Sequence, residues 1–393
     1  MDSAAATGER APLFGGFTRE EFHTRIRRTR QALERAGIDA LLTFANKVLP
    51  GHTRYLSGYE TRHGIHDWTV LILDLDPVRP PRLVTNVSWE PLAQMSWVED
   101  ARLSGLDQLG GAIADWLRPG VKLLGVAGFP FLPAPVYRAL AERLPQARIE
   151  DASGLLFEVR RVKSPAEVAA LRKASEISDA GGSAFLAGAR EGRSEREILV
   201  EVESALKLNG SDEVSFTTQV GSGLSTVTIC PYATDRRLEK GDLVQLDCGA
   251  TYLGYRGDLS RVTVVGEPSA RQRLLLEVTA EMYEVMLAAI RPGAAASEVA
   301  RIGIDIARSR GLEHGLYQSP THPIYFMGHG IGAGYHEPPE LNLLTDAPLE
   351  ENMVMVLEPI LSEKGVGGVK LEDPVLVTAR GAERLSRCPL RNW

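Results

Sequence analysis

The stretch LDCGATYLGYRGDLSR, residues 246 to 261, lies within a longer run, 242–266, whose two apolar segments flank a glycine-rich centre. Leu and Val on both sides of such a centre predict a strand, a turn and a second strand. Asp247 closes the first segment and Asp258 lies across the turn, where an ionised carboxylate would be costly to bury without a partner. Glu358 and Glu372 interrupt two later apolar segments, MVMVLEP and GVKLEDPVLV, in the same way. Four such carboxylates in one part of the chain call for a common explanation.

Around this hairpin, the second half of the chain groups its helices apart from its strands. Two long helical patterns precede the hairpin and a helical pair follows it, and the chain then returns to strands; these segments are 164–189, 194–210, 269–290, 297–310, 352–360 and 367–378. Separate helices and an antiparallel, hairpin-rich sheet are typical of an α+β domain. We expect this domain to cover residues 161–393.

The first half of the chain has a different order of predicted helices and strands. A helix is predicted at 18–38, with Thr18 and Glu21 as a capping box and Gly37 as its stop. Short apolar segments then alternate with helical patterns; the segments are 39–45, 67–76, 81–86 and 122–128, and the helices 109–117 and 134–144. Alternation of this kind predicts an α/β domain over residues 16–160, preceded by a flexible tail, residues 1–15.

Composition limits the partners that we expect. The 393 residues carry a formal net charge of −7 with no long basic run, so neither nucleic acid nor a membrane surface is expected as a partner. The start of the chain lacks the basic-then-apolar order of a signal peptide, and three scattered cysteines suit a reducing compartment. We therefore expect a cytoplasmic protein.

The four intrusive carboxylates have two competing explanations. Each could pair with a base, but the bases nearby are few (Arg256, Arg261 and Lys370), and pairing would neutralise about half of the charge. A shared divalent-metal site would neutralise all four at once. GHGIGAGYHEPPE, residues 328–340, adds His329 and His336, and oxygen ligands with one imidazole suit Mn, Fe, Co or Zn.

At this point the motifs resemble a known family. LDCGATYLGYRGDLSR, GHGIGAGYHEPP, LEP and KLEDPVLVT together are similar to the pita-bread metallohydrolases: methionine aminopeptidase, aminopeptidase P, prolidase and creatinase. The segment RRVKSPAEVAALRKASEISDA, residues 160–180, resembles the interdomain helix of that family. The resemblance implies a creatinase/prolidase-type α/β N-terminal domain followed by an α+β pita-bread catalytic domain.

The resemblance also implies roles for individual residues. It assigns two divalent metal ions (Mn, Co, Fe or Zn, with manganese as our expectation) to the ligand set Asp247, Asp258, His329, Glu358 and Glu372. Glu358 would act in addition as the general base toward the water between the ions. His336 would contact the substrate and stabilise the tetrahedral centre, although an anchoring contact of His336 with Glu337 is an alternative. Arg261 would lie behind the ligands and orient one of their carboxylates.

Two segments depart from the family pattern. Cys230, in TICPYATDRRLEKGD, stands where the family has a substrate-facing histidine, and a thiol cannot shuttle protons as an imidazole does. In PGHTRYLSGYETRHGIHDW, residues 50–68, Arg62 and His63 lie in a loop that in the creatinase branch enters the active site of the partner subunit. A solvated loop is the alternative for Arg62 and His63. His322 could line the same pocket or serve the structure. We expect a homodimer from the resemblance.

The predicted function is therefore a dinuclear-metal hydrolase that cleaves a C–N bond, with an Xaa-Pro dipeptide or short peptide as substrate. The alternative is a family member that hydrolyses or eliminates from a small metabolite, which Cys230 favours. A non-catalytic relative that only binds partners is a third possibility, which retention of the complete ligand set argues against.

Overall fold

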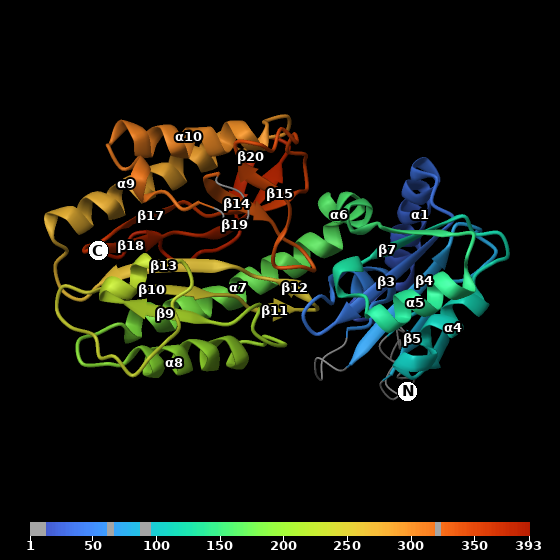
Figure 1. The fold of residues 1–393 in the computed structure, drawn as a ribbon. Coiled ribbons are helices and arrows are strands. Elements are labelled where there is room, and N and C mark those ends of the chain that lie inside the picture. Colours follow the sequence, from blue (N-terminus) through green and yellow to red (C-terminus); the bar gives the residue numbers. More distant parts are fainter. Residues whose placement is uncertain (1–12, 61–66, 87–95, 319–323) are drawn as a thin grey trace, which may run out of the picture. The chain divides into compact units, whose positions relative to one another are not determined.

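The computed structural model describes residues 13–60, 67–86, 96–318 and 324–393, and the chain divides into two compact units, Met1–Val159 and Arg160–Trp393 (Figure 1). Across the described residues, no helix is long and apolar enough to cross a membrane.

The first unit contains a six-stranded sheet in the order β6-β5-β4-β3-β7-β8. Strands β3 and β4 and strands β4 and β5 are antiparallel, whereas β3–β7, β5–β6 and β7–β8 are parallel. The strands are β3 (Ala40–Asn46), β4 (Trp68–Asp74), β5 (Arg82–Thr85), β6 (Asp100–Leu103), β7 (Leu123–Ala127) and β8 (Arg148–Asp151), and a small hairpin, β1 (Leu13–Phe14) and β2 (Phe17–Thr18), precedes them. The helices are α1 (Arg19–Ala36), α2 (Gly51–Ser57), α4 (Leu106–Trp116), α5 (Ala134–Arg143) and α6 (Ser153–Arg161), and the sequence boundary between the two units falls within α6.

Helix α1 shows how the sequence sets its limits. The Thr18 hydroxyl accepts a hydrogen bond from the backbone N–H of Glu21, and Gly37 ends the helix with a left-handed φ of 66°. A hydroxyl at this position satisfies a free N–H of the first turn, and glycine adopts the left-handed conformation at least cost. Both ends are those predicted from the sequence.

The second unit places its helices outside two antiparallel sheets. Sheet β13-β10-β9 packs against α7 and α8, and sheet β15-β14-β16-β19-β20 packs against α9 and α10 (Figure 1). The helices are α7 (Pro165–Gly188), α8 (Glu195–Leu208), α9 (Ala270–Ala289) and α10 (Ala296–Ser309). The strands are β9 (Gln219–Ser222), β10 (Leu243–Cys248), β11 (Thr251–Tyr252), β12 (Tyr255–Arg256), β13 (Leu259–Val264), β14 (Phe326–Gly330), β15 (Glu337–Asn342), β16 (Val354–Leu357), β17 (Ile360–Glu363), β18 (Gly367–Lys370), β19 (Asp373–Thr378) and β20 (Gly381–Arg384).

The two strands predicted at 352–360 and 367–378 are each broken in the structure. The first divides into β16 and β17 at Glu358 and Pro359, and the second into β18 and β19 at Leu371 and Glu372. The reason is a change of partner, because β16 and β19 pair with each other whereas β17 and β18 form a separate hairpin. The breaks place both glutamates at a junction between sheets.

Candidate active site

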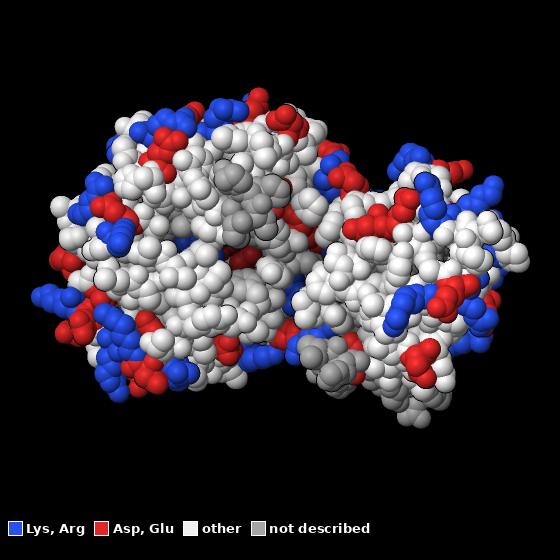
Figure 2. All heavy atoms as spheres, viewed as in Figure 1, with Lys and Arg blue, Asp and Glu red and all other residues white. Residues whose placement is uncertain are grey.

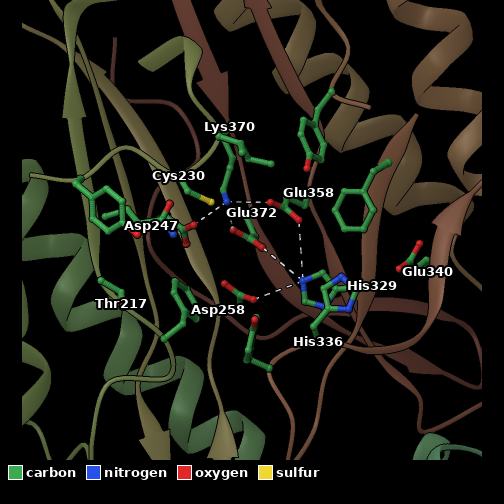
Figure 3. A pocket seen from close by; sticks show the side chains of 17 residues that line it. Thr217, Cys230, Asp247, Asp258, His329, His336, Glu340, Glu358, Lys370 and Glu372 are labelled. Carbon is green, nitrogen blue, oxygen red and sulfur yellow. Dashed lines mark hydrogen bonds and ion pairs between the residues drawn. The ribbon is translucent and has the colours of Figure 1, made fainter. Parts of the chain in front are cut away.

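Five side chains that the sequence singled out converge on one pocket of the second unit (Figure 3). Asp247 lies in β10, Asp258 directly precedes β13, His329 lies in β14, Glu358 follows β16 and Glu372 precedes β19. All five are buried, with at most 5% of each residue exposed. The predicted ligands from both sheets therefore meet at the seam between them.

Backbone contacts fix this seam. Ser260 and Glu372 exchange two backbone hydrogen bonds of 3.2 Å, which link β13 to the start of β19. The Ser260 hydroxyl also donates to Oε2 of Glu372 at 2.7 Å. Gly328, with φ of 144°, allows β14 to approach β16, since a Cβ at this position would lie 2.0 Å from the carbonyl oxygen of Val356.

His329 faces three carboxylates through one ring nitrogen. Its Nε2 lies 3.6 Å from Oδ2 of Asp258, 3.9 Å from Oε1 of Glu372 and 4.0 Å from Oε2 of Glu358. The other nitrogen, Nδ1, lies 2.9 Å from the carbonyl oxygen of Gly330, so it carries the proton and donates it there. Burial, aided by His336, lowers the pKa of His329 well below its usual value. A neutral imidazole with its Nε2 lone pair directed at carboxylate oxygens is an arrangement that requires a cation.

Lys370, at the end of β18, occupies the other side of the cluster. Its Nζ lies 2.7 Å from Oδ2 of Asp247, 2.9 Å from Oε1 of Glu358 and 3.5 Å from Oε2 of Glu372 (Figure 3). Burial opposes the charge of Lys370, but the three carboxylates outweigh it and raise its pKa well above the usual value. Pairing with a nearby base, one of the two explanations for the buried carboxylates, therefore applies to Asp247, Glu358 and Glu372.

The pKa values of the four carboxyl groups are all raised, because burial penalises their charged forms. The pKa of Asp247 rises to about 6 and that of Glu372 to about 7. The pKa of Asp258 lies well above its usual value through burial and repulsion by Glu372, and that of Glu358 is raised as well. One ammonium does not offset four buried carboxylates, and a bound cation would lower these pKa values.

The donor set fits a divalent metal ion. Oδ1 of Asp247 and Oδ1 of Asp258 are buried without a hydrogen-bond partner among the described residues. Asp258, His329 and Glu372 each offer an atom within 4.8 Å of the others. Ligand atoms at about 2.1 Å from one ion lie about 3.0–3.4 Å apart, so closures of up to about 1.8 Å would bring this group to coordinating distance.

The pocket above this cluster is compact. Its volume is about 570 Å³, in the range of sites for small ligands, and acidic atoms are visible at the bottom of a hollow in this unit (Figure 2). Its walls are largely aromatic: Phe216, Tyr232, Tyr317, Phe326 and Tyr335. These residues come from separate loops and strands, and the sequence analysis did not find them.

His336 and Cys230 both line this pocket. The ring of His336 stacks on that of His329, with centroids 4.3 Å apart. Glu337, the anchor considered as an alternative for His336, directs its carboxylate instead to Arg160, Lys163 and the backbone N–H of Gly334. The Cys230 side chain lies beside Lys370 in Figure 3, and desolvation raises the pKa of its thiol, which favours the neutral form.

Arg261 contacts the backbone behind the cluster. It is fully buried, and its guanidinium donates to the carbonyl oxygen of Glu372 at 2.9 Å and to Oδ1 of Asp373 at 2.6 Å. It also donates to the carbonyl oxygens of Cys388 and Pro389. Arg261 therefore holds Glu372 through its main chain, whereas the sequence analysis expected a contact with a ligand carboxylate.

Lys370 is the residue of this cluster whose contacts the sequence analysis missed. It was considered as a nearby base, without a place in the site. A signal was available, since Lys370 and Glu372 are two residues apart in a strand-like segment and such residues share a face. The predictions for Arg62, His63 and His322 lie outside the described residues.

Comparison with known proteins identifies the family. The sequence profile of metallopeptidase family M24 matches residues 169–379, and that of the creatinase/prolidase N-terminal domain matches residues 25–162. The Xaa-Pro dipeptidase of Pyrococcus horikoshii is 32% identical over 268 residues, which are 68% of this chain and 74% of that relative. The Xaa-Pro dipeptidase of Pyrococcus furiosus is 36% identical over 240 residues, 61% of this chain and 66% of that relative.

Solved structures show the same architecture over almost the whole chain. The prolidase of Pyrococcus horikoshii superimposes with a TM-score of 0.82 at 26% identity, covering 94% of this chain and 99% of that one. The Xaa-Pro dipeptidase of Bacillus anthracis gives 0.82 at 27% identity, with the same coverage of 94% and 99%.

The chain therefore belongs to metallopeptidase family M24, with a creatinase/prolidase-type domain before the catalytic domain. The predicted resemblance, fold class and metal-dependent hydrolase activity are confirmed. The peptidase interpretation is supported over the small-metabolite alternative.

Proposed function

We propose that this protein is a divalent-metal-dependent Xaa-Pro dipeptidase. The observation that carries the proposal is the meeting of four buried carboxylates with the neutral Nε2 of His329 at the base of one compact pocket. The substrate class, Xaa-Pro dipeptides, is proposed because the relatives in the two Pyrococcus species are Xaa-Pro dipeptidases.

The metal-binding residues in this proposal are those of the predicted ligand set: Asp247, Asp258, His329, Glu358 and Glu372. When bound, a divalent ion supplies Lewis-acid chemistry, which polarises an amide carbonyl and makes water a stronger nucleophile at neutral pH. His329 is held for this task by the hydrogen bond from its Nδ1 to Gly330. Glu372 is held by Ser260 and by the contact of its carbonyl with Arg261.

Glu358 is the proposed general base. Its Oε2 faces the same space as His329 Nε2, so it can accept the proton of the attacking water and pass it to the leaving nitrogen. His336 projects into the pocket beside His329, where an N–H of its ring can donate to the oxygen of the scissile carbonyl. The thiol of Cys230 borders the substrate space near Lys370 and offers a weak donor there.

The test compares dipeptides on defined metal forms. Protein freed of metal with a chelator is reloaded separately with Mn, Co, Fe or Zn and assayed on Xaa-Pro dipeptides, on matched dipeptides without proline and on Xaa-Pro tripeptides. We expect turnover of the Xaa-Pro dipeptides that is lost on chelation and restored by at least one metal. If the folded protein binds metal but turns over no peptide, the proposal is wrong, and the small-metabolite alternative is favoured instead.

A Cys230→His variant belongs in the same assay. An imidazole can both donate and accept a proton near neutral pH, so we expect this variant to retain or increase dipeptide turnover. The predicted homodimer is tested separately by measuring molar mass in solution by light scattering. A monomer that turns over dipeptides would contradict the expected role of the loop around Arg62.

A further inference from the structure

Glu358 and Glu372 each direct one carboxylate oxygen toward His329 and the other toward Lys370. Oε2 of Glu358 and Oε1 of Glu372 are the atoms nearest Nε2 of His329, at 4.0 and 3.9 Å. Oε1 of Glu358 and Oε2 of Glu372 are the atoms near Nζ of Lys370, at 2.9 and 3.5 Å. The pair of carboxylates therefore spans two neighbouring positions, each suited to a cation.

One of these positions contains a cation that belongs to the chain. Lys370 is 4% exposed, and its ammonium has three N–H donors directed among three carboxylates. The shortest of these contacts is the 2.7 Å hydrogen bond to Oδ2 of Asp247. Asp247 and Glu358 are the two predicted ligands that lie outside the group of ligand atoms formed by Asp258, His329 and Glu372.

We infer that the site binds one divalent ion, at Asp258, His329 and Glu372, and that the ammonium of Lys370 takes the place of a second ion beside Asp247 and Glu358. The inference rests on the proposed metal-dependent function. It replaces the two ions expected from the sequence with one and removes Asp247 and Glu358 from the set of residues that bind metal.

Geometry and charge both support one metal ion beside His329 and the Lys370 ammonium in place of a second ion. A second ion would need the oxygens of Asp247 and Glu358 that Lys370 already binds at 2.7 and 2.9 Å. It would also lie within a few ångströms of an ammonium, and two like charges this close repel strongly in a protein interior. Lys370 supplies the fixed positive charge that holds Asp247 and Glu358 in place, so those side chains need no metal of their own.

The experiment counts ions per chain. Wild-type protein and the variants Lys370→Met, Lys370→Arg and Lys364→Met are equilibrated with Mn²⁺, and bound metal is measured by elemental analysis after dialysis. Electron paramagnetic resonance of the same samples separates isolated Mn²⁺ from a spin-coupled pair. Lys364 is an exposed lysine in the turn of the β17–β18 hairpin and serves as the matched control.

We expect one ion per chain and an isolated-ion spectrum for wild type, Lys370→Arg and Lys364→Met. Lys370→Met, which removes the charge and keeps an unbranched side chain, is expected to bind a second ion and to show a coupled pair. Two tightly bound ions in the wild-type protein would overturn the inference and leave the proposed function standing. No bound ion in folded wild-type protein would overturn the proposed function itself.

The metal content of Lys370→Met provides a second test of the inference. If wild type and folded Lys370→Met both bind one ion, Lys370 is not what excludes the second ion and the inference fails. If Lys370→Met does not fold, as judged by circular dichroism, Lys370→Gln replaces it. The wild-type count still decides against the inference whenever it reaches two.

Discussion

The imidazole of His336 stacks on that of His329, with ring centroids 4.3 Å apart and ring planes 18° apart. Phe326 extends the stack, 5.9 Å from His336 and 6.1 Å from His329. Desolvation lowers the pKa of both histidines, so the stack consists of neutral rings near neutral pH. His329 faces the carboxylates and His336 lies beside it in the pocket, so in the proposed function binding of the ion is separated from contact with the substrate.

This separation predicts the behaviour of His336→Ala. The carboxylates and His329 remain, so we expect the metal content to stay unchanged while kcat falls by about 10²-fold or more through loss of a proton-donating group. Metal analysis and dipeptide kinetics check both parts. His314→Ala, at an exposed histidine, is the control and should leave both values unchanged. Loss of metal together with activity would show that His336 serves the ligand set instead.

Substitution of Arg261 by Met should destabilise the catalytic unit. The change leaves the fully buried carboxylate of Asp373 without its 2.6 Å ion pair, and breaking a buried pair from one side costs roughly 3–5 kcal/mol. Urea unfolding gives the free-energy difference. Arg172→Met removes an exposed pair with Glu383 and should cost at most about 1 kcal/mol. Equal effects of the two variants would contradict the structural role of Arg261.

Cysteine labelling tests the position of Cys230. Cys230 is exposed, whereas Cys248 and Cys388 are buried. Native protein treated briefly with a maleimide should take up one label per chain by mass spectrometry, and the Cys230→Ala variant should take up none. Excess proline-containing dipeptide should slow the labelling, since Cys230 lines the pocket. Fast labelling of a second cysteine in the folded protein would contradict the burial of that residue.

Asp39, in the first unit, should make stability depend on pH. Burial opposes its charge, but the backbone amides of Lys122 and Leu123 and the Arg118 guanidinium outweigh this and lower the pKa of Asp39. A lowered folded-state pKa contributes stability that is present above the unfolded pKa of about 3.9 and is lost as the pH falls through the folded value. Asp39→Asn should therefore cost roughly 1–3 kcal/mol at pH 7 and progressively less below about pH 4.

Tryptophan fluorescence during urea unfolding reports mainly on this unit, since four of the five tryptophans lie in it and only Trp393 lies in the second. Asp115→Asn changes an exposed partner of Arg143 and should have little effect at any pH. A difference between wild type and Asp39→Asn that stayed constant from pH 7 to pH 3 would contradict the prediction.

Most of the helices and many of the strands follow from local signals in the sequence, whereas helices α2 and α6 and strands β9, β14, β15 and β20 were not predicted. Thr18 and Gly37 mark the ends of α1, and Ser164 and Ser194 begin α7 and α8 with capping boxes that the structure contains. The edge strands β6 and β8 were missed because they are four residues long and mostly exposed or half-buried, so they lack an apolar pattern.

The candidate site was predictable where an unusual residue type interrupts a pattern. A carboxylate in an apolar strand is conspicuous, which is why Asp247 and Glu358 stood out. A lysine at the end of a strand is common, and the only sequence signal that Lys370 faces inward is its spacing of two residues from Glu372. The aromatic walls, such as Phe216 and Tyr335, come from distant segments that only the folded chain brings together.

The contacts of Arg261 with the carbonyl oxygens of Cys388 and Pro389 affect where a purification tag should be placed. The same guanidinium donates to the carbonyl oxygen of Glu372, so one buried side chain contacts both Cys388–Pro389 and the candidate site. A purification tag fused after Trp393 would begin five residues beyond Pro389, close to these contacts. Expression with an N-terminal tag is therefore the better choice for kinetic and metal-binding work.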